Sequence, residues 1–445
     1  MESGGESRQI RPRDDNPEIP AYPGLLMRTR TSLVAAFLFV LLVLALRGAD
    51  HAGAPIRFRN VAANSGLRLV LENNPTPRKY LVETMPGGVA AFDYNGDGLT
   101  DIYFTNGASL PSLEKTSPRY WNRLYRNLGG FRFQDVTESA RVAGAGYSMG
   151  AAAADYDNDG HVDLFVAGVG RNILYHNRGD GAFEDVTQQA GIKSGPWSIG
   201  AAWLDYDNDG LLDLFVVNYV RWSPDLDPFC GDASRQVRVY CHPQFFEGLP
   251  NTLYHNEGNG KFKDVSRESG IASHVGKGMG VAVADYDRDG LMDVFVANDK
   301  MPNFLFHNLG HGKFEEVALQ AGAALLDTGN PVSGMGVDFR DYNNDGLPDI
   351  ALDALGGETF RLFGIQGRDC SRMRLLESHG YREQKSTAGG ESACSISTMT
   401  AARTCSLPTL IPMKAVSDSD LIPVTRSDAM SVNIGAQRRW RRYRA

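Results

Sequence analysis

Residues 154–166 read ADYDNDGHVDLFV, an acidic loop set between two apolar runs. Four further copies share this frame: FDYNGDGLTDIYF from Phe92, LDYDNDGLLDLFV from Leu204, ADYDRDGLMDVFV from Ala284 and RDYNNDGLPDIAL from Arg340. Counted from the first Asp of each loop, oxygen-bearing side chains recur at positions 1, 3, 5 and 9, and Gly stands at position 6. This repeated loop decides both the architecture and the chemistry of the chain.

The spacing of the loop is that of a calcium site. A hard cation takes about six to eight oxygen ligands, and a tight loop turns alternate side chains inward. Glycine at position 6 permits the sharp turn, as it does in an EF-hand. No Glu stands at position 12, however, and the flanks are short apolar runs rather than amphipathic helices. We therefore expect each loop to join two β-strands.

Asp, Asn and Gly also make good hairpin turns without a metal, and a single copy would leave that alternative open. Five copies favour calcium, because carboxylates crowded into a turn repel one another. Position 7 would contribute only its backbone carbonyl, and the loops with Asn at position 3 should bind more weakly. The predicted ligands of up to five Ca²⁺ ions, one per loop, are Asp93, Asn95, Asp97, Leu99 and Asp101; Asp155, Asp157, Asp159, His161 and Asp163; Asp205, Asp207, Asp209, Leu211 and Asp213; Asp285, Asp287, Asp289, Leu291 and Asp293; and Asp341, Asn343, Asp345, Leu347 and Asp349.

The chain of 445 residues has a net charge of −8, and its excess of acidic residues lies in 55–363. Acid gathered in metal-binding loops argues against a nucleic-acid partner. Residues 1–54 are predicted to be an N-terminal extension with a signal peptide. Arg28 and Arg30 precede an apolar run at 33–46, which small residues follow, and Met27 is the expected start. The run is short for a membrane span, so we expect cleavage and export to the periplasm, cell surface or exterior; an uncleaved membrane tether is the alternative.

A second motif follows the first four acidic loops. It reads as a hairpin, with short β-favouring arms around an Asn/Gly-rich turn. Each repeat then holds four strands, and the loops recur every 50 to 62 residues apart from one 80-residue interval. Such a period predicts an all-β propeller of four-stranded blades over 55–363, with an insertion at 219–250. The motif copies are NRLYRNLGGFRFQDVT at Asn122, NILYHNRGDGAFEDVT at Asn172, NTLYHNEGNGKFKDVS at Asn251 and NFLFHNLGHGKFEEVA at Asn303.

Together the two motifs resemble the FG-GAP/VCBS repeat of integrin-alpha-type β-propellers, and are most similar to the cartilage acidic protein and UnbV-like group. The resemblance covers about 58–363. It implies a seven-bladed propeller with calcium in the first hairpin loop of several blades, and a further C-terminal domain. Relatives of this kind are mostly adhesion or interaction proteins, while some propellers with similar calcium loops are polysaccharide lyases.

The face opposite the calcium loops is the predicted ligand face, because adjacent loops of an antiparallel blade emerge on opposite sides. Aromatic and charged side chains there suggest a binding surface; the alternative is that the aromatic rings fill gaps between blades. Cys230 and Cys241 are expected to form a disulfide in an exported chain, with a metal pair as the competing interpretation. The candidate ligand-face residues are Lys79, Tyr80, Trp121, Trp197, Arg221, Trp222, Tyr240 and His242.

The fifth repeat breaks off after Phe363, where GIQGRDCSRMRL replaces the second hairpin motif. Reading these codons one nucleotide earlier allows RNxGxGLFEDAT, the missing motif, and the same shift turns STMT at Ser397 into FDYD. We therefore hypothesise that 364–445 is an out-of-frame or non-native tail; a functional basic tail is the alternative. About five blades then remain in frame, so the ring would be incomplete and its open edges prone to aggregate. The segment FRNVA at Phe58 resembles the last strand of a blade.

The function expected from these features is that of a non-enzymatic, exported calcium-binding module for adhesion or for binding an extracellular protein or glycan. The alternative is a lyase-like polysaccharide-active enzyme or a lectin that uses the opposite face. Such a lyase would need a base such as His242 or Tyr240 near a cation such as Arg221 or Lys300. No nucleophile elbow, HExxH pair or phosphate-binding loop is present in the sequence, and no catalytic residue is predicted.

Overall fold

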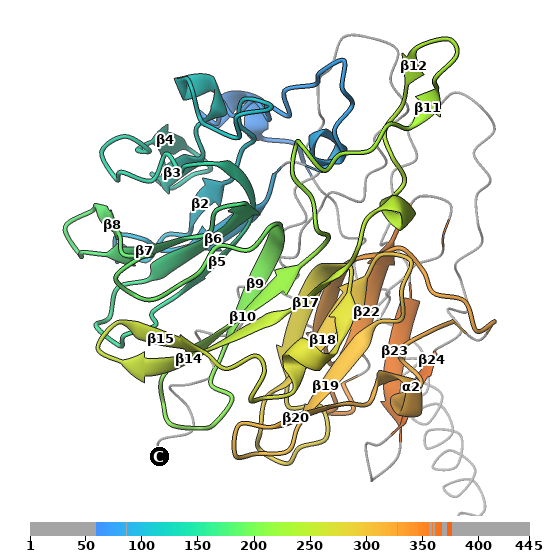
Figure 1. Cartoon of the computed structure of the whole chain (residues 1–445). Coiled ribbons are helices and arrows are strands. Elements are labelled where there is room, and N and C mark those ends of the chain that lie inside the picture. The colour runs from blue at the N-terminus through green and yellow to red at the C-terminus, as the bar shows by residue number, and fades with distance from the viewer. Residues whose placement is uncertain are drawn as a thin grey trace, which may run out of the picture. The chain divides into compact units, whose positions relative to one another are not determined.

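The computed structural model describes residues 59–85, 87–326, 328–342, 344–355, 358, 361–366 and 372–375. These residues form five four-stranded antiparallel sheets. Figure 1 shows the sheets following one another in chain order around a common centre. The predicted all-β propeller is confirmed, with five blades in the described part of the chain. The predicted signal peptide and the tail beyond 375 lie outside the described residues.

The first three blades each begin with an acidic-loop hairpin and continue with the hairpin of the second motif. Short apolar runs form the buried second strand of each blade, as expected for a strand covered on both faces. The strands of blade 1 are β1 (Val89–Phe92), β2 (Asp101–Phe104), β3 (Arg123–Asn127) and β4 (Phe133–Asp135); those of blade 2 are β5 (Tyr147–Ala154), β6 (Asp163–Val169), β7 (Ile173–Asn177) and β8 (Phe183–Asp185); those of blade 3 are β9 (Ser198–Leu204), β10 (Asp213–Asn218), β14 (Thr252–Gly258) and β15 (Lys261–Asp264).

The last two blades repeat this plan, and short elements fill the connections. Blade 4 comprises β17 (Gly278–Ala284), β18 (Asp293–Asn298), β19 (Phe304–Asn308) and β20 (Phe314–Glu316), and blade 5 comprises β21 (Gly334–Arg340), β22 (Asp349–Ala354), β23 (Arg361–Gln366) and β24 (Arg372–Leu375). The connecting elements are η1 (Ala62–Asn64), η2 (Leu81–Thr84), η3 (Pro118–Tyr120), β11 (Gly231–Asp232), β12 (Val237–Arg238), η4 (Pro243–Phe245), β13 (Leu249–Pro250), η5 (Ile271–Ser273), β16 (Val275–Gly276) and α2 (Ala318–Ala321). No helix among the described residues is both long and apolar enough to cross a bilayer.

A hairpin follows Phe363 although the residues there lack the second motif. Strands β23 and β24 pair antiparallel, with Phe363 opposite Leu375, and β23 also pairs with β22. Strand pairing uses backbone N–H and C=O groups, so the sheet can be completed without the side chains of the motif. The fifth blade therefore has four strands, and the hypothesis that the tail is out of frame stays a prediction.

In blades 1 to 4 the outer strand donates a backbone hydrogen bond to the turn that ends the preceding repeat. The Phe183 N–H donates to Ala140 O at 3.0 Å, and the Phe133 N–H donates to Ser65 O at 2.6 Å. Ser65 thus occupies, ahead of blade 1, the place that Ala140 occupies ahead of blade 2. This equivalence agrees with the interpretation of FRNVA as the outer strand of a preceding blade.

Glycine lets the inner strands of adjacent blades approach closely. A Cβ atom added to Gly150 in β5 would lie 2.5 Å from the Ile199 carbonyl oxygen of β9, and one added to Gly280 would lie 2.3 Å from Met335 O. Contacts this short with backbone atoms cannot be relieved by moving a side chain. Gly200, the matching residue of β9, would meet nothing within 4 Å.

Gly150→Ala is therefore expected to destabilise the chain by about 1–3 kcal/mol, the usual cost of overpacking a core. Gly200→Ala provides the matched control, since its added methyl group has space and removes chain entropy from the unfolded state. Urea unfolding in calcium-saturated buffer measures both. Equal midpoints for the two variants would show that the blades do not approach at Gly150 as described.

Candidate metal sites and the opposite face

Each acidic loop connects the first and second strands of its blade, and its register is fixed by the strand pair beneath it. In blade 2, Ala154 pairs with Asp163 at the base of the loop, and in blade 3 Leu204 pairs with Asp213. Position 1 therefore follows one strand directly, and position 9 begins the next. The topology brings both carboxylates to the same end of the hairpin.

The carboxylate at position 9 is buried and accepts backbone hydrogen bonds through both of its oxygens. Its relative exposure is 0–1% in all five blades. In each blade its Oδ2 accepts the N–H of the tyrosine at position 2, at 3.0–3.2 Å. Its Oδ1 accepts a backbone N–H from the third strand of the blade, at 2.7–3.1 Å. These residues are Asp101, Asp163, Asp213, Asp293 and Asp349.

The carboxylates at positions 1 and 5 accept backbone N–H groups from within the loop. In all five loops the Oδ2 at position 1 accepts the N–H of the glycine at position 6, at 2.7–3.1 Å. The Oδ1 at position 5 accepts the N–H of position 7, at 2.8–3.0 Å. Each carboxylate keeps further lone pairs for a cation. Of the predicted ligands, only Asn343 lies outside the described residues.

Crowding and burial make these carboxylates costly to ionise without a cation. Burial raises the pKa of Asp163 and of Asp213 to about 8. It also raises the pKa of Asp101, Asp293 and Asp349 to about 6. A bound divalent ion would favour the charged form and offset this cost. Clusters such as Asp155, Asp157 and Asp163 have one oxygen each within 4.8 Å of one another, which suits a shared ion.

Three histidines that the sequence analysis did not assign to the sites point into loops 2, 3 and 4. His176, His255 and His307 lie on the third strand of their blades, at the variable position of the N-x-L-Y-x-N motif. Their Nδ1 atoms lie 3.1–3.2 Å from the carboxylate at position 9. Strand alternation was the available signal, since the residue between two buried neighbours of this motif must face the loop.

The loops are joined to the next blade through the tyrosine at position 2. The ring of Tyr156 lies 5.4 Å from that of Phe262 on the following blade, and Tyr206 lies 5.9 Å from Phe314. The loops also touch directly: Asn158 Nδ2 donates to Gly210 O at 3.1 Å in the next loop. The acidic loops therefore contribute to the packing between neighbouring blades.

Three of the predicted ligand-face residues are not exposed. Tyr80, Trp197 and Trp222 have relative exposures of 5%, 0% and 2%. The Trp222 ring makes edge contacts with Tyr80 at 5.8 Å and with Trp197 at 5.6 Å. The prediction that they form a ligand surface was wrong, because a ring of blades leaves a gap that large aromatic side chains fill. Trp121, Lys79 and Tyr240 are half-buried, while Arg221 and His242 are exposed.

The candidates for lyase chemistry are held by separate contacts rather than brought to one point. Tyr240 Oη donates to Glu83 Oε2 at 2.9 Å, and His242 Nδ1 accepts the Gln244 N–H at 3.1 Å. Arg221 pairs with Glu247 at 2.9 Å. Lys300 pairs with Glu358. Lys79 Nζ lies over the Tyr240 ring, 5.3 Å from its centroid.

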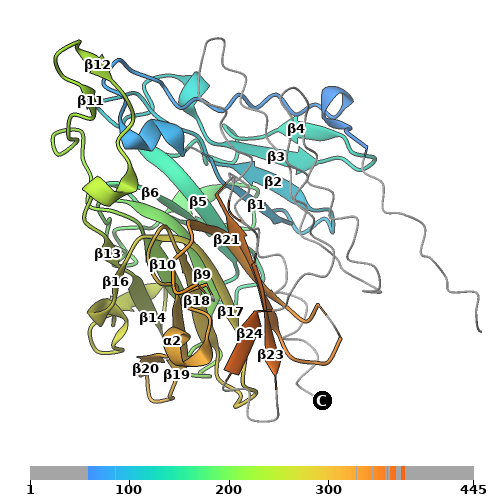
Figure 2. The same ribbon diagram turned by 90° about the vertical axis from the view of Figure 1, so that its right-hand side faces the viewer.

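The insertion between β10 and β14 is pinned by a disulfide and a buried ion pair. Cys230 and Cys241 are joined by an S–S bond, with Cα atoms 5.3 Å apart. Asp227 accepts hydrogen bonds from Trp222 Nε1 at 2.7 Å and from Arg238 Nη2 at 2.6 Å. Figure 2 shows the β11–β12 hairpin of this insertion standing clear of the sheets. The insertion is thus stabilised by a covalent cross-link and an ion pair of its own.

Asp227→Ala is expected to destabilise the insertion by about 3–5 kcal/mol, because it removes the carboxylate that neutralises the largely buried Arg238 guanidinium and leaves only the Pro228 carbonyl oxygen bonded to it. Asp225→Ala, at an exposed position two residues earlier, is the matched control and should be nearly neutral. Limited proteolysis of the insertion together with thermal unfolding measures the effect. Equal protease resistance in both variants would contradict the assigned role of the ion pair.

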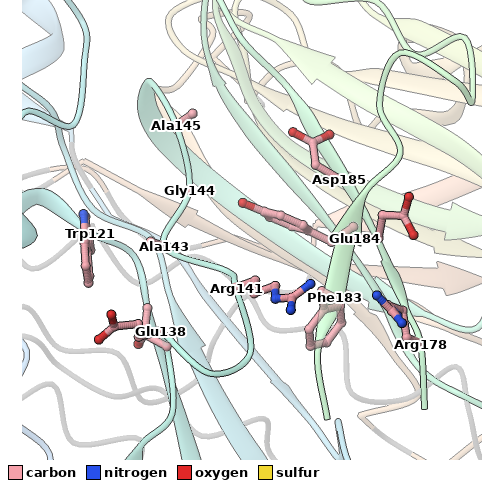
Figure 3. A pocket seen from close by; sticks show the side chains of 12 residues that line it. Trp121, Glu138, Arg141, Ala143, Gly144, Ala145, Arg178, Phe183, Glu184 and Asp185 are labelled. Carbon is pink, nitrogen blue, oxygen red and sulfur yellow. The ribbon is translucent and has the colours of Figure 1, made fainter. Parts of the chain in front are cut away.

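A groove of about 620 Å³ opens where blades 1 and 2 adjoin. In Figure 3 the Arg141 and Arg178 side chains lie near the Phe183 ring, and Trp121 stands at the opposite side. Acidic side chains also line it, among them Glu184 and Asp185. The groove thus combines aromatic rings with charges of both signs, and it includes Trp121 from the predicted ligand face.

Comparison with known proteins agrees with this architecture. FG-GAP-like repeats match residues 93–166, 155–216, 245–296 and 285–352, more than half of the chain in all. Cartilage acidic protein 1 of Homo sapiens is 38% identical over 95 residues, which cover 21% of this chain and 14% of the human protein. The Mus musculus protein is 36% identical over 102 residues, covering 22% of this chain and 15% of the mouse protein. The aligned stretch therefore spans only a small part of these relatives.

Solved structures show weaker likeness. An Agrocybe aegerita lectin that recognises non-reducing terminal N-acetylglucosamine has a TM-score of 0.35 and 18% identity, with 65% of each chain covered. The V. cholerae biofilm matrix protein Bap1 has a TM-score of 0.34 and 13% identity, with 71% of this chain and 40% of Bap1 covered. These scores are too low to bear on function. The repeat matches lie within the five-bladed region, and the chain belongs to the FG-GAP-like repeat family.

Proposed function

We propose that the protein is an exported, calcium-binding β-propeller that acts as a non-enzymatic binding or adhesion module. The ions are structural and hold the first hairpin of each blade. The observation that carries the proposal is the fivefold recurrence of one carboxylate geometry. In every blade an Asp at position 1, directly after the first strand, and a fully buried Asp at position 9, at the start of the second strand, lie at the two ends of the same loop. Carboxylates gathered in this way are stabilised when a divalent ion joins them.

Export is supported by the disulfide between Cys230 and Cys241, since such bonds persist in oxidising compartments. The apolar run at 33–46 after Arg28 and Arg30 supports it as well. Extracellular calcium modules bind with Kd of about 10⁻⁴ to 10⁻³ M, a range suited to permanent occupancy outside the cell. We assign the ions a structural rather than a signalling role on this ground.

The partner we propose is an extracellular protein or glycan, bound without turnover. The insertion between β10 and β14 presents large apolar side chains to solvent, with relative exposures of 46–60%. Exposed apolar side chains mark interaction sites where they form a contiguous patch, and we propose that these side chains do so. These residues are Leu226, Phe229, Val237, Val239 and Phe245.

Metal analysis and ligand arrays test the proposal together. Protein purified in Ca²⁺ and desalted should retain bound calcium, and titration of chelated protein should return up to five ions per chain, with loops 1 and 5 the weakest. On arrays of glycans and extracellular proteins, binding should require Ca²⁺ and leave the captured ligand unchanged. Absence of bound calcium refutes the metal role, and cleavage of a captured glycan refutes the non-enzymatic role.

A further inference from the structure

We propose that the loops of blades 2, 3 and 4 also accept a divalent transition-metal ion of the Zn²⁺ class, bound through a histidine nitrogen in addition to the carboxylates. This inference rests on the proposed function, in which the acidic loops are metal sites. It divides the loops into two kinds: loops 1 and 5, which offer oxygen ligands only, and loops 2 to 4, which offer oxygen and nitrogen. The second kind would bind Zn²⁺ in the presence of a large excess of Ca²⁺.

The three histidines occupy one equivalent position and face one equivalent pair of carboxylates. His176 Nδ1 lies 3.2 Å from Asp163 Oδ1 and 3.3 Å from Asp157 Oδ2. In blade 3, His255 Nδ1 lies 3.2 Å and 3.5 Å from the carboxylates at positions 9 and 3. In blade 4, His307 Nδ1 lies 3.1 Å and 3.6 Å from them. The same arrangement of one histidine nitrogen and two carboxylate oxygens therefore recurs in three blades.

These separations fit neighbouring ligands of a single small ion. Zinc binds His nitrogen and carboxylate oxygen at about 2.0–2.2 Å, so two of its ligands lie about 3.0–3.5 Å apart for bond angles between a right angle and the tetrahedral angle. The observed N···O distances of 3.1–3.6 Å fall close to that range. Clusters of Asp157, Asp159 and His176, of Asp207, Asp213 and His255, and of Asp287, Asp293 and His307 each have one ligand atom per residue within 4.8 Å of the others.

Hydrogen bonding does not account for all of these nitrogens. The Nδ1 atoms of His176 and His255 are buried and, despite their short distances to carboxylates, have no aligned hydrogen-bond partner among the described residues. His307 Nδ1 does bond to Asp293 Oδ1, at 3.1 Å, but there Asp285 Oδ1 is the buried atom without a hydrogen-bond partner in the described part of the chain. Buried polar atoms are usually satisfied. In blades 2 and 3 the unpaired nitrogen therefore belongs to the cluster itself, and in blade 4 the unpaired oxygen belongs to the Asp at position 1 of the same loop.

Blades 1 and 5 carry other residues at the position of the histidines and so provide an internal comparison. Strand register places Arg126 of β3 and Gly364 of β23 at the position of the histidines, since the residues before them pair with Ile102 and Ile350 in the same way. Arg126 forms an ion pair with Asp97 at 3.1 Å and so brings a positive charge to loop 1. Glycine offers no ligand. Neither blade provides a nitrogen donor at this point.

The chemistry of the donors separates the two kinds of loop. Ca²⁺ prefers oxygen ligands in large, flexible shells. Imidazole nitrogen favours Zn²⁺, Ni²⁺, Cu²⁺ and related ions, and a neutral imidazole can bind through Nδ1 when its proton is on Nε2. A site of one imidazole and two or three carboxylates therefore discriminates against Ca²⁺ in favour of Zn²⁺. The structural alternative is that each histidine only donates a hydrogen bond to the carboxylate at position 9.

The test is Zn²⁺ uptake by the full chain dialysed against millimolar Ca²⁺ with micromolar Zn²⁺, followed by metal analysis. The expected result is up to three Zn²⁺ per chain. Titration with Co²⁺ should give the d–d absorption of a site with a nitrogen ligand. His176→Gln, His255→Gln and His307→Gln should each remove one Zn²⁺, and the triple variant should lose them all. Its far-UV circular dichroism without metal should match that of the parent chain, which excludes misfolding as the cause of the loss.

A variant designed to gain a Zn²⁺ site provides a second test. Arg126→His combined with Asn95→Asp gives loop 1 the ligand set of loops 2 to 4 and should add one Zn²⁺ site. Zn²⁺ uptake that is unchanged in the triple variant, or no uptake by the parent chain while Ca²⁺ still binds, would overturn this inference and leave the calcium proposal standing. Failure to bind Ca²⁺ with Zn²⁺ uptake intact would overturn the calcium proposal alone.

Discussion

In excess EDTA the Tm of this protein is expected to fall by roughly 10 °C or more relative to saturating Ca²⁺. A ligand that binds only the folded state stabilises it by about 1.4–2.7 kcal/mol per site at ten to a hundred times its Kd. Five loops of similar geometry would together contribute several times that amount, and about 1 kcal/mol shifts the Tm of a large domain by about 2–4 °C. Differential scanning calorimetry in the two buffers measures the difference.

Two variants at position 1 separate the metal contribution from general damage to the loop. Asp205→Ala removes a ligand from a loop with four Asp side chains, whereas Asp93→Ala acts on a loop with Asn95 at position 3 and an ion pair between Arg126 and Asp97. Both lose hydrogen bonds from loop N–H groups. The calcium-dependent part of the Tm should therefore shrink more in Asp205→Ala. An identical Tm of the parent chain in EDTA and Ca²⁺ would refute a structural role for the ions.

The fold was predictable because both of its hairpin signals are local. The DxDxDGxxD loop fixes the first hairpin, and the Asn/Gly-rich turn after residues such as Asn172 fixes the second. Alternation of apolar residues then defines the strands. Blade 5 shows the limit of these signals, because the turn motif is absent from Gly364 onward and yet β23 and β24 pair. There β23 pairs with β22 through backbone hydrogen bonds, an interaction that no sequence pattern reveals.

The candidate site was predictable only in its loop residues. Predicted ligands such as Asp155 and Asp163 lie at a fixed spacing in one segment, while His176 reaches them from the next hairpin across a strand pair. The error over Tyr80, Trp197 and Trp222 has a related cause. Their burial depends on how several blades meet, and composition does not distinguish an exposed aromatic side chain from one that fills the gap between sheets.

The stability of the protein is expected to respond to acid in opposite directions with and without calcium. In the metal-free fold, burial raises the pKa of Asp163 and Asp213 to about 8, far above the value of about 3.9 in an unfolded chain. A group with a raised folded pKa contributes stability that is present at low pH and is lost as the pH rises through the folded pKa. Acidification from pH 8 towards pH 5 should therefore stabilise the metal-free protein.

In EDTA, the free energy of unfolding should increase by about 1.4 kcal/mol per pH unit of acidification for each such group between pH 5 and 7. In that range the group is protonated only in the folded state. Asp101, Asp293 and Asp349, with pKa values of about 6, add to this increase below pH 6. In saturating Ca²⁺ the ions keep the carboxylates charged, so the same acidification displaces metal and lowers the Tm. Thermal melts across pH 5–8 in EDTA and in Ca²⁺ should thus converge at low pH and diverge at high pH. Parallel curves would mean that the buried carboxylates at position 9 are not coupled to the metal, and the loops would then be turns rather than ion sites.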